Sequence, residues 1–197
     1  FLAYRERYLT LSKDPRYAIV TIFKNHKMAA GTSLKHPHSQ IVASPVTPMH
    51  IRHRMEEAMK HFDNNGECVL CTLIRKEKEL QERIIFETEN FIVVSPYAPR
   101  SPFAMLVCPK KHDAAYGYIS VNKAKELGFV MRQVLSKLNK ALNNPAYNYM
   151  VASAPCHEDN LEYFHWHIEI MPRIARVAGF ELGSGIFINS VIPEDAA

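Results

Sequence analysis

The sequence predicts an α+β fold built on a mainly antiparallel sheet. Several short runs of β-branched and aromatic residues are separated by turn residues, which is typical of strands joined by short connections. Helical periodicity is sustained over one long stretch, residues 121–142, and over one shorter stretch, residues 49–62. Because the strands do not alternate regularly with helices, we expect one antiparallel sheet with helices packed on it.

The first part of the chain places its predicted elements around a pair of histidines. In chain order these are a helix end at 1–12, a strand at 17–23, a polar loop at 25–35, a strand at 39–46 and a helix at 49–62. Asp14-Pro15 ends the first helix, and Pro48 suits the first turn of the second one. Asn64-Asn65-Gly66 then forms the one plausible domain boundary, which divides the chain into residues 1–62 and 63–197.

The second part is predicted to hold most of the strands and the long helix. A charged segment at 75–83 follows the boundary. The predicted strands lie at 84–86, 91–94, 103–108, 147–152 and 163–171, with two further short apolar segments at 180–182 and 186–188. The first two strands flank Thr88-Glu89-Asn90 as a hairpin. Asn143-Asn144-Pro145 ends the long helix.

Composition narrows the class of protein. The 197 residues carry a formal net charge of +4 with a sequence pI near 8.8, a mild excess that suits an anionic substrate rather than nucleic acid. No apolar run approaches the roughly 20 residues that span a bilayer, so we expect no membrane partner. Four cysteines do not make a disulfide scaffold, which favours a reducing cytoplasm. The chain starts without Met or a signal peptide, so we expect it to be truncated.

The histidine pair His36-Pro37-His38 suits phosphoryl or nucleotidyl transfer. Pro37 stiffens the backbone, and alternation along a strand would place both imidazoles on one side. An imidazole can attack phosphorus while a neighbour holds its other nitrogen. Asn25, Ser33 and Gln40 would supply neutral donors, and the amides of residues 30–32 could form an anion-binding nest. The alternative is a strand start with two surface histidines.

A second group of residues has the composition of a zinc site. Cys68 and Cys71 have the Cys-x-x-Cys spacing, His112 ends a predicted strand, and His165 starts one. Two thiolates and two imidazoles around one ion make a closed structural site. Unliganded thiols are the alternative. A redox role is less favoured because the pair follows a helix and turn. Cys108 and Cys156 are expected to be ordinary buried or loop cysteines.

His165-Trp166-His167-Ile168-Glu169 is an echo of the first histidine motif and predicts a duplicated unit. His167 and Glu169 could form a second metal site, contact a substrate or form a hydrogen-bonded pair in the core. Beyond them, Gly179-Phe180-Glu181 and Gly183-Ser184-Gly185 would let a ligand approach the backbone closely, or they serve turns only.

Together these motifs resemble the galactose-1-phosphate uridylyltransferases, members of the histidine-triad superfamily that are built from two similar halves. The matching segments are Phe23-Lys24-Asn25, Ala30-Gly31-Thr32-Ser33, His36-Pro37-His38-Ser39-Gln40, His165-Trp166-His167-Ile168-Glu169-Ile170, Gly179-Phe180-Glu181 and Pro193-Glu194-Asp195-Ala196. The resemblance implies a histidine-triad-like fold with two pseudo-repeated halves. Residues 1–62 would be the end of the first, catalytic half, and residues 63–197 the second half with the zinc site.

The resemblance also implies a ping-pong reaction. His38 would attack the α-phosphorus of UDP-glucose and carry a uridylyl group, which galactose 1-phosphate would then accept. Asn25, Ser33 and Gln40 match contacts to phosphoryl oxygens, and His36 matches a zinc ligand whose partners precede Phe1. Gly179, Phe180 and Glu181 match residues that reach the sugar phosphate in the partner subunit's site, which implies a homodimer.

Three departures from the family pattern bear on these expectations. The family's nucleoside pocket lies in the segment that precedes Phe1. Lys27 stands where the family usually has glycine. The Cys68, Cys71, His112 and His165 set resembles the zinc set of a branch that includes plant ADP-glucose phosphorylase, whereas other members hold iron in this half. An adenylyltransferase or phosphorylase of the same fold therefore stays an alternative, as does a non-catalytic, zinc-stabilised nucleotide-binding module.

Overall fold

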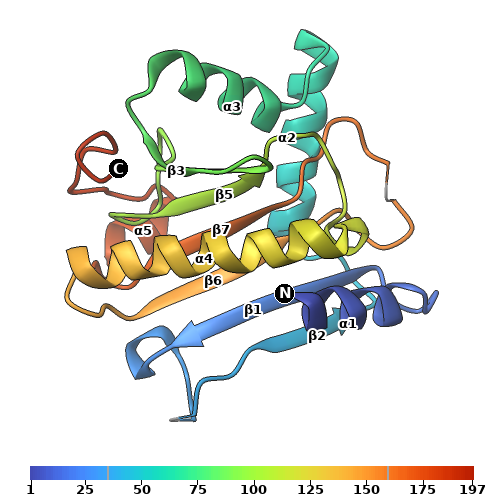
Figure 1. Ribbon diagram of the computed structural model, residues 1–197, viewed down its shortest axis with the longest axis horizontal. Coiled ribbons are helices and arrows are strands. Elements are labelled where there is room, and N and C mark those ends of the chain that lie inside the picture. Colours follow the sequence, from blue (N-terminus) through green and yellow to red (C-terminus); the bar gives the residue numbers. More distant parts are fainter. Residues whose placement is uncertain (35, 159) are drawn as a thin grey trace.

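The chain folds around one antiparallel sheet, as predicted. The computed structural model describes residues 1–34, 36–158 and 160–197. Within these residues the sheet has seven strands in the order β2-β1-β6-β7-β5-β4-β3 (Figure 1). The strands are β1 Ile19–His26, β2 Gln40–Ser44, β3 Ile84–Glu87, β4 Phe91–Val94, β5 Met105–Pro109, β6 Tyr147–Ala152 and β7 His167–Pro172. The predicted 84–86/91–94 hairpin is confirmed as the antiparallel pair β3 and β4.

Helices surround the sheet, and the first and the longest of them pack on its strands. They are α1 Leu2–Ser12, α2 Met49–Asn65, α3 Val69–Leu80, α4 Val121–Ala141 and α5 Gly179–Ser184, with 3-10 turns at Met28–Ala30 and Tyr116–Tyr118. Figure 1 shows α4 lying across the sheet with α1 beside it on the same face. The main hydrophobic core lies under these two helices, where Leu127 and Val134 meet Trp166 and Ile168.

The long helix forms where the sequence predicts it. Ser120 caps its first turn by accepting a 3.2 Å hydrogen bond from the backbone amide of Lys123. Its buried residues recur at intervals of three and four, so one face is apolar and covers the sheet. Asn143 and Asn144 follow it with φ of 52° and 60°, a conformation that ends a helix.

The N-terminal helix is held against the sheet at one close approach. Tyr8 is 1% exposed and its hydroxyl hydrogen-bonds Ser153 at 2.9 Å. A Cβ atom on Gly117 would lie 2.5 Å from the Tyr8 ring, so only glycine fits beneath it. The predicted helix at 1–12 is confirmed. Its packing against the sheet depends on Gly117, which lies more than one hundred positions away in the sequence.

Some predicted elements differ from the observed ones. The helix α3 was not expected, because its charged second half hid the apolar spacing of Val69, Leu73 and Ile74. Residues 180–182 lie in the short helix α5, and residues 186–188 in neither helix nor strand. The strands β2 and β7 begin later than predicted, at Gln40 and His167. No helix within the described residues is long and apolar enough to cross a membrane.

The backbone conformation at Lys27 explains why glycine would suit this position. Its φ of 69° and ψ of 163° fall in a region that is essentially restricted to glycine. Lys27→Gly is therefore expected to stabilise the fold by about 1 kcal/mol, which corresponds to roughly 2–4 °C in Tm for a chain of this size. Thermal unfolding followed by circular dichroism measures this. Lys111→Gly, at an exposed residue without positive φ, is the control and should leave Tm unchanged or lower. A lower Tm for Lys27→Gly would contradict the argument.

Candidate active site and metal centre

His38 lies two residues before the start of β2. Its Nδ1 is 2.9 Å from the carbonyl oxygen of His36. Because a carbonyl oxygen only accepts hydrogen bonds, Nδ1 carries the proton and donates it. The other ring nitrogen, Nε2, then keeps its lone pair, as a nucleophile requires. The side chain of His38 is half-buried, and that of His36 is exposed.

The strand alternation expected for these histidines is wrong in detail, since β2 starts only at Gln40. What holds His38 is the turn back onto His36 and the end of the neighbouring strand. The Lys24 ammonium group donates to the His38 carbonyl oxygen at 3.4 Å, and Gln40 is paired with Phe23 across the ladder. The motif therefore lies beside the last residues of β1.

The predicted anion-binding nest of residues 30–32 does not form. The amide of Ala30 donates to the Lys27 carbonyl oxygen at 3.1 Å, and that of Thr32 donates to the same oxygen at 3.3 Å. Gly31, with φ of 89°, donates to Met28 at 2.9 Å. These amides close a tight turn and are not directed at a ligand.

The neutral donors predicted around His38 are distributed over three segments. Asn25 is half-buried on β1, whereas Ser33 and Gln40 are exposed. Phe23 and Asn25 are two residues apart on β1, so their side chains lie on the same face of the sheet. Phe23 pairs with Gln40 on β2, so the side chain of Gln40 shares this face. Within the described residues neither Ser33 nor Gln40 hydrogen-bonds the His38 ring. Their predicted contacts would therefore be made through a ligand.

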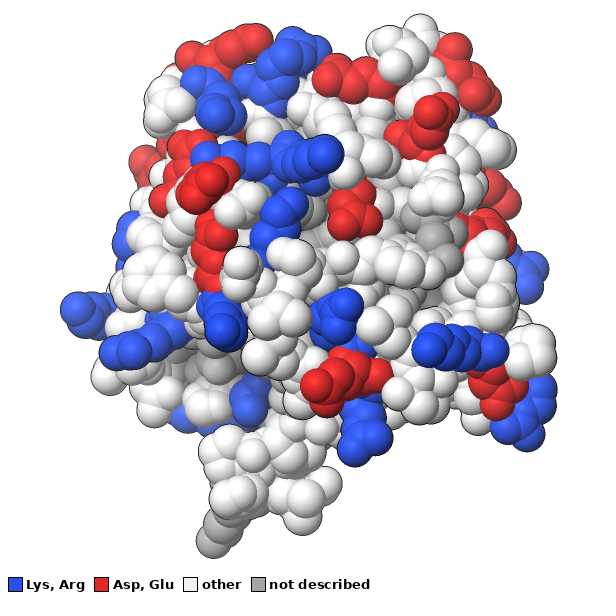
Figure 2. Space-filling view, turned by 45° about the vertical axis from the view of Figure 1, so that its right-hand side comes forward, with Lys and Arg blue, Asp and Glu red and all other residues white. Residues whose placement is uncertain are grey.

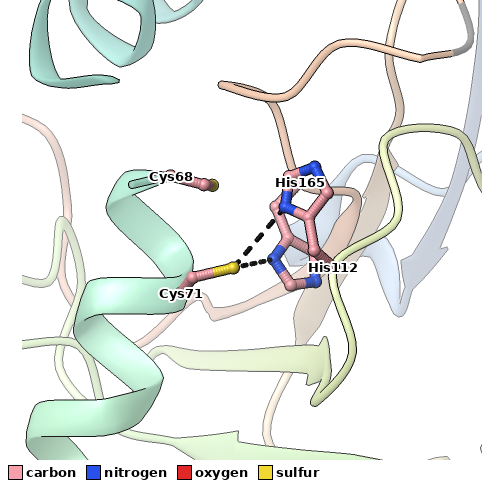
Figure 3. Close-up of side chains that lie close together, drawn as sticks. All are labelled: Cys68, Cys71, His112 and His165. Atoms are coloured by element: carbon pink, nitrogen blue, oxygen red, sulfur yellow. Dashed lines mark hydrogen bonds between the residues drawn. The ribbon is translucent and has the colours of Figure 1, made fainter. Parts of the chain in front are cut away.

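The cysteine and histidine group predicted as a zinc site comes together. Figure 3 shows Cys68 and Cys71 at the start of α3 directed at His112 and His165. One ligand atom from each residue lies within 4.8 Å of all the others. The Cys71 sulfur is 3.5 Å from Nδ1 of both His112 and His165. Neighbouring ligands of a tetrahedral zinc ion are about 3.5 Å apart for bonds of roughly 2.3 and 2.0 Å, so the group fits.

A hydrogen bond prepares His112 for metal binding, and burial prepares His165. His112 Nε2 is 3.2 Å from the Leu161 carbonyl oxygen, so this nitrogen carries the proton and Nδ1 is free to bind. His165 is 2% exposed. Its burial, with His112 and His167 nearby, lowers its pKa to about 3, so the ring is neutral at physiological pH. Neutral imidazole is the form that binds a metal.

The two thiols require a cation to ionise together. Burial opposes ionisation of Cys68, but the neighbouring His112 side chain and backbone amides outweigh it, so the pKa of Cys68 is lowered. Burial and the neighbouring Cys68 raise the pKa of Cys71 to about 12. One thiolate thus excludes the other unless a positive ion lies between them. The donor set therefore fits a metal such as zinc. Cys108 and Cys156 are buried outside this group, as expected.

The second histidine motif repeats one detail of the first. His167 Nδ1 is 2.9 Å from the His165 carbonyl oxygen, the same contact that His38 makes with His36. Its Nε2, however, lies 3.4 Å from a Glu169 carboxylate oxygen, and the Arg54 guanidinium from α2 also contacts this carboxylate. Of the three interpretations left open by the sequence, the hydrogen-bonded pair is the one formed here. Arg54 was not predicted, because its partner lies 115 positions further along the chain.

Loss of Arg54 should destabilise the fold in a pH-dependent way. Burial alone would raise the pKa of Glu169, but hydrogen bonds from His167 and Arg54 lower it to about 2. A lowered carboxyl pKa stabilises the folded state above the ordinary value near 4.5 and loses this contribution as pH falls toward 2. Arg54→Met is expected to cost about 2 kcal/mol at pH 7, because a buried carboxylate loses its cation.

Urea unfolding at pH 7 and at pH 3 measures this contribution. The penalty of Arg54→Met should be smaller at pH 3 than at pH 7. Arg52→Met, an exposed neighbour on the same helix, is the matched control and should change little at either pH. Equal penalties for Arg54→Met at both pH values would exclude the electrostatic explanation.

The remaining predicted residues lie beyond β7. Gly179 and Phe180 are exposed, and a Glu181 carboxylate oxygen accepts the amide of Ala178 at 3.0 Å. Glu181 thereby caps its own short helix. Large apolar side chains on this segment are exposed as well, among them Phe180, Leu182, Ile186 and Ile188. Such a surface is typical of a protein–protein contact.

Comparison with known proteins agrees with this architecture. The family model for "Galactose-1-phosphate uridyl transferase, C-terminal domain" matches residues 52–190. The chain belongs to the galactose-1-phosphate uridylyltransferase family. This confirms the resemblance read from the motifs, and the histidine-triad-like fold expected with it.

Named relatives fall into two enzyme groups. The chain is 35% identical to an Arabidopsis thaliana ADP-glucose phosphorylase, over 100% of this chain and 55% of the relative. It is 32% identical to a Thermotoga maritima galactose-1-phosphate uridylyltransferase, over 98% of this chain and 62% of the relative. The structure of the Arabidopsis ADP-glucose phosphorylase with bound ADP-glucose superimposes with a TM-score of 0.92, at 34% identity over 99% of this chain and 62% of that one. The chain thus spans a little over half the length of these relatives.

Proposed function

We propose that this protein is a nucleotidyltransferase that uses His38 as a covalent carrier. The observation that supports this most directly is the hydrogen bond from His38 Nδ1 to the His36 carbonyl oxygen, which leaves Nε2 with a free lone pair. Membership of the uridylyltransferase family agrees with it. His167, in the second histidine motif, cannot serve as a nucleophile in this way, because its Nε2 faces Glu169.

The reaction proceeds in two displacements at one phosphorus. Nε2 of His38 attacks the α-phosphorus of a nucleoside diphosphate sugar, and the bond to the bridging oxygen breaks, so that a sugar 1-phosphate leaves. The nucleotidyl group is then held on the imidazole. A phosphate oxygen of a second substrate attacks the same phosphorus, and the imidazole leaves with its electron pair. Imidazole suits both steps because it is a competent nucleophile and a good leaving group.

Neutral hydrogen-bond donors, and a glutamine instead of a basic histidine at position 40, fit transfer between phosphates. Asn25, Ser33 and Gln40 would hold the phosphoryl oxygens as charge moves during each displacement. Gln40 stands where a histidine triad has its last histidine, and an amide does not activate water as a base would. Transfer to a phosphate acceptor is therefore favoured over hydrolysis.

The substrate pair we favour is UDP-glucose and galactose 1-phosphate, with transfer of a uridylyl group. A second candidate is transfer of an adenylyl group from ADP-glucose to phosphate, as the name of the 35% identical Arabidopsis relative indicates. On the face shown in Figure 2, basic and acidic side chains are interspersed.

The Cys68, Cys71, His112 and His165 group would hold zinc in a structural role, since four protein ligands leave no open position for substrate. His36 would belong to a further zinc site in the first half. Within the described residues it joins no group of three or more possible ligands. The exposed segment around α5 would contact a second copy of the chain and bring Gly179, Phe180 and Glu181 to that copy's sugar phosphate.

The choice between the two reactions is tested by turnover with defined acceptors. Full-length protein is incubated with UDP-glucose plus galactose 1-phosphate, and with ADP-glucose plus inorganic phosphate. Formation of UDP-galactose in the first mixture supports the uridylyltransferase. Formation of ADP only in the second moves the assignment to the phosphorylase. No product in either mixture contradicts both.

A further inference from the structure

A buried asparagine on β6 links the end of β1 to the turn before the histidine motif. Asn148 is 8% exposed and pairs directly with Asn25 across the β1–β6 ladder. Its Nδ2 donates to the Asn25 Oδ1 at 2.7 Å and to the Ala30 carbonyl oxygen at 2.8 Å. Its Oδ1 accepts from Nε of Arg173, the first residue after β7, at 2.5 Å. Every polar atom of this amide is therefore engaged.

These contacts fix the direction in which each amide faces. A guanidinium group only donates, so the atom of Asn148 that meets Arg173 must be the oxygen. The nitrogen of Asn148 then faces Ala30 and Asn25, and the Ala30 carbonyl, which only accepts, agrees with this orientation. Asn25 must consequently turn its oxygen toward Asn148. Its own Nδ2 is left as the donor and faces Gly31. A Cβ atom built on Gly31 would lie 4.0 Å from this nitrogen.

We propose that Asn148 and Arg173 are positioning residues for nucleotidyl transfer, which set the Asn25 amide so that it presents its donor to a phosphoryl oxygen of the substrate. This rests on the proposed function, in which Asn25 contacts phosphate. A phosphoryl oxygen is an acceptor, so an Asn25 turned the other way would repel it. Because the tight turn uses its own amides, a correctly oriented side-chain donor matters more at this site.

The same chain of hydrogen bonds joins distant parts of the molecule. Arg173 begins the segment that leads to α5, and its backbone amide is tied to the Ala146 carbonyl oxygen at 2.7 Å. Through Asn148 this residue is connected to the residue proposed to hold phosphate. The orientation of the Asn25 amide is thus set through Asn148, by Arg173 just beyond β7 together with the Ala30 carbonyl oxygen.

Asn148→Asp tests this inference with almost no change in shape. The carboxylate keeps its partner Arg173, but it presents an oxygen to the Ala30 carbonyl and to Asn25 Oδ1. The Asn25 amide should therefore turn over and present its oxygen to the substrate. We expect kcat/KM to fall about 10²-fold, the loss typical for one misplaced donor at a reacting phosphoryl or acyl oxygen. Asn122→Asp, at an exposed position on α4, adds the same charge and should retain wild-type activity.

A double-mutant cycle separates positioning from a general structural effect. In an Asn25→Ala background there is no amide to orient, so Asn148→Asp should cause no further loss of kcat/KM. An equal loss in both backgrounds, or no loss in either, would overturn the inference. Should Asn148→Asp fail to fold, variants of Arg173 provide the test. Arg173→Gln keeps a hydrogen-bond donor and should be more active than Arg173→Met. Equal activities of these two variants would refute the positioning role.

Failure of the proposed function gives a different result. A wild-type protein that turns over neither UDP-glucose nor ADP-glucose contradicts the nucleotidyltransferase assignment, and the inference falls with it. Turnover by the wild type, with Asn148→Asp as active as Asn122→Asp, leaves the assignment intact and refutes the positioning role alone.

Discussion

His38→Gln is expected to abolish nucleotidyl transfer while leaving the fold intact. Glutamine has no nucleophilic nitrogen, so the covalent intermediate cannot form, and kcat should fall by about 10⁴-fold or more. The side chain of His38 is half-buried, and within the described residues its ring hydrogen-bonds only the adjacent His36 carbonyl oxygen. Tm and metal content should therefore match those of the wild type. Steady-state turnover with the preferred nucleotide sugar measures the loss.

Two other histidines serve as comparisons for this variant. His53→Gln, at an exposed position on α2, should change neither turnover nor stability. His167→Gln should retain turnover although it disturbs the contact to Glu169, since its Nε2 is not available for attack. If His167→Gln removed activity as completely as His38→Gln, the two copies of the motif would share the chemistry, contrary to the assignment made here.

Removal of a metal ion bound by the cysteine and histidine group should destabilise the fold strongly. The Cys68, Cys71, His112 and His165 group joins the start of α3 to the segments that follow β5 and precede β7. Without a cation one of its two thiols stays protonated, and the group no longer holds these segments together. We expect Cys71→Ser to lose the metal and to lower Tm by about 10 °C.

Metal analysis of freshly purified protein, with and without chelator, accompanies the unfolding measurement. Wild type should contain about one zinc ion for this site, and chelator should reproduce the lowered Tm of Cys71→Ser. Cys156→Ala, a buried cysteine outside the group, should keep its zinc. Protein that contains no metal in this site and unfolds at the same temperature after chelator treatment would contradict a structural zinc.

The sequence predicted those features that depend on local pattern. Strands such as Tyr147–Ala152 and the long helix Val121–Ala141 follow from period-two and period-3.6 hydrophobic spacing, and both were placed within one residue. The metal group was also predictable, because Cys-x-x-Cys spacing and strand-end histidines restrict where ligands can meet. The interpretation of Lys27 followed from the resemblance, and the positive φ gives it a physical basis.

Features that depend on tertiary contact were not predictable in this way. The amides of residues 30–32 looked available for an anion, but whether a turn uses its own amides depends on its dihedral angles. Arg54 and Asn148 carry no sequence signal, since their partners Glu169 and Asn25 lie 115 and 123 positions away. Helix α3 was hidden because charged residues fill its solvent face and shorten the apparent apolar run.

Covalent labelling tests the central claim most directly. Full-length protein is incubated with UDP-glucose, and separately with ADP-glucose, each labelled at the α-phosphate, and the labelled residue is located by peptide mapping. We expect acid-labile label on His38, as a phosphoramidate requires, and none on the His38→Gln variant. Label from ADP-glucose alone would place the protein with the adenylyl-transferring relatives and keep His38 as the carrier. Absence of label from both, or label on another residue such as His167, would contradict the assignment.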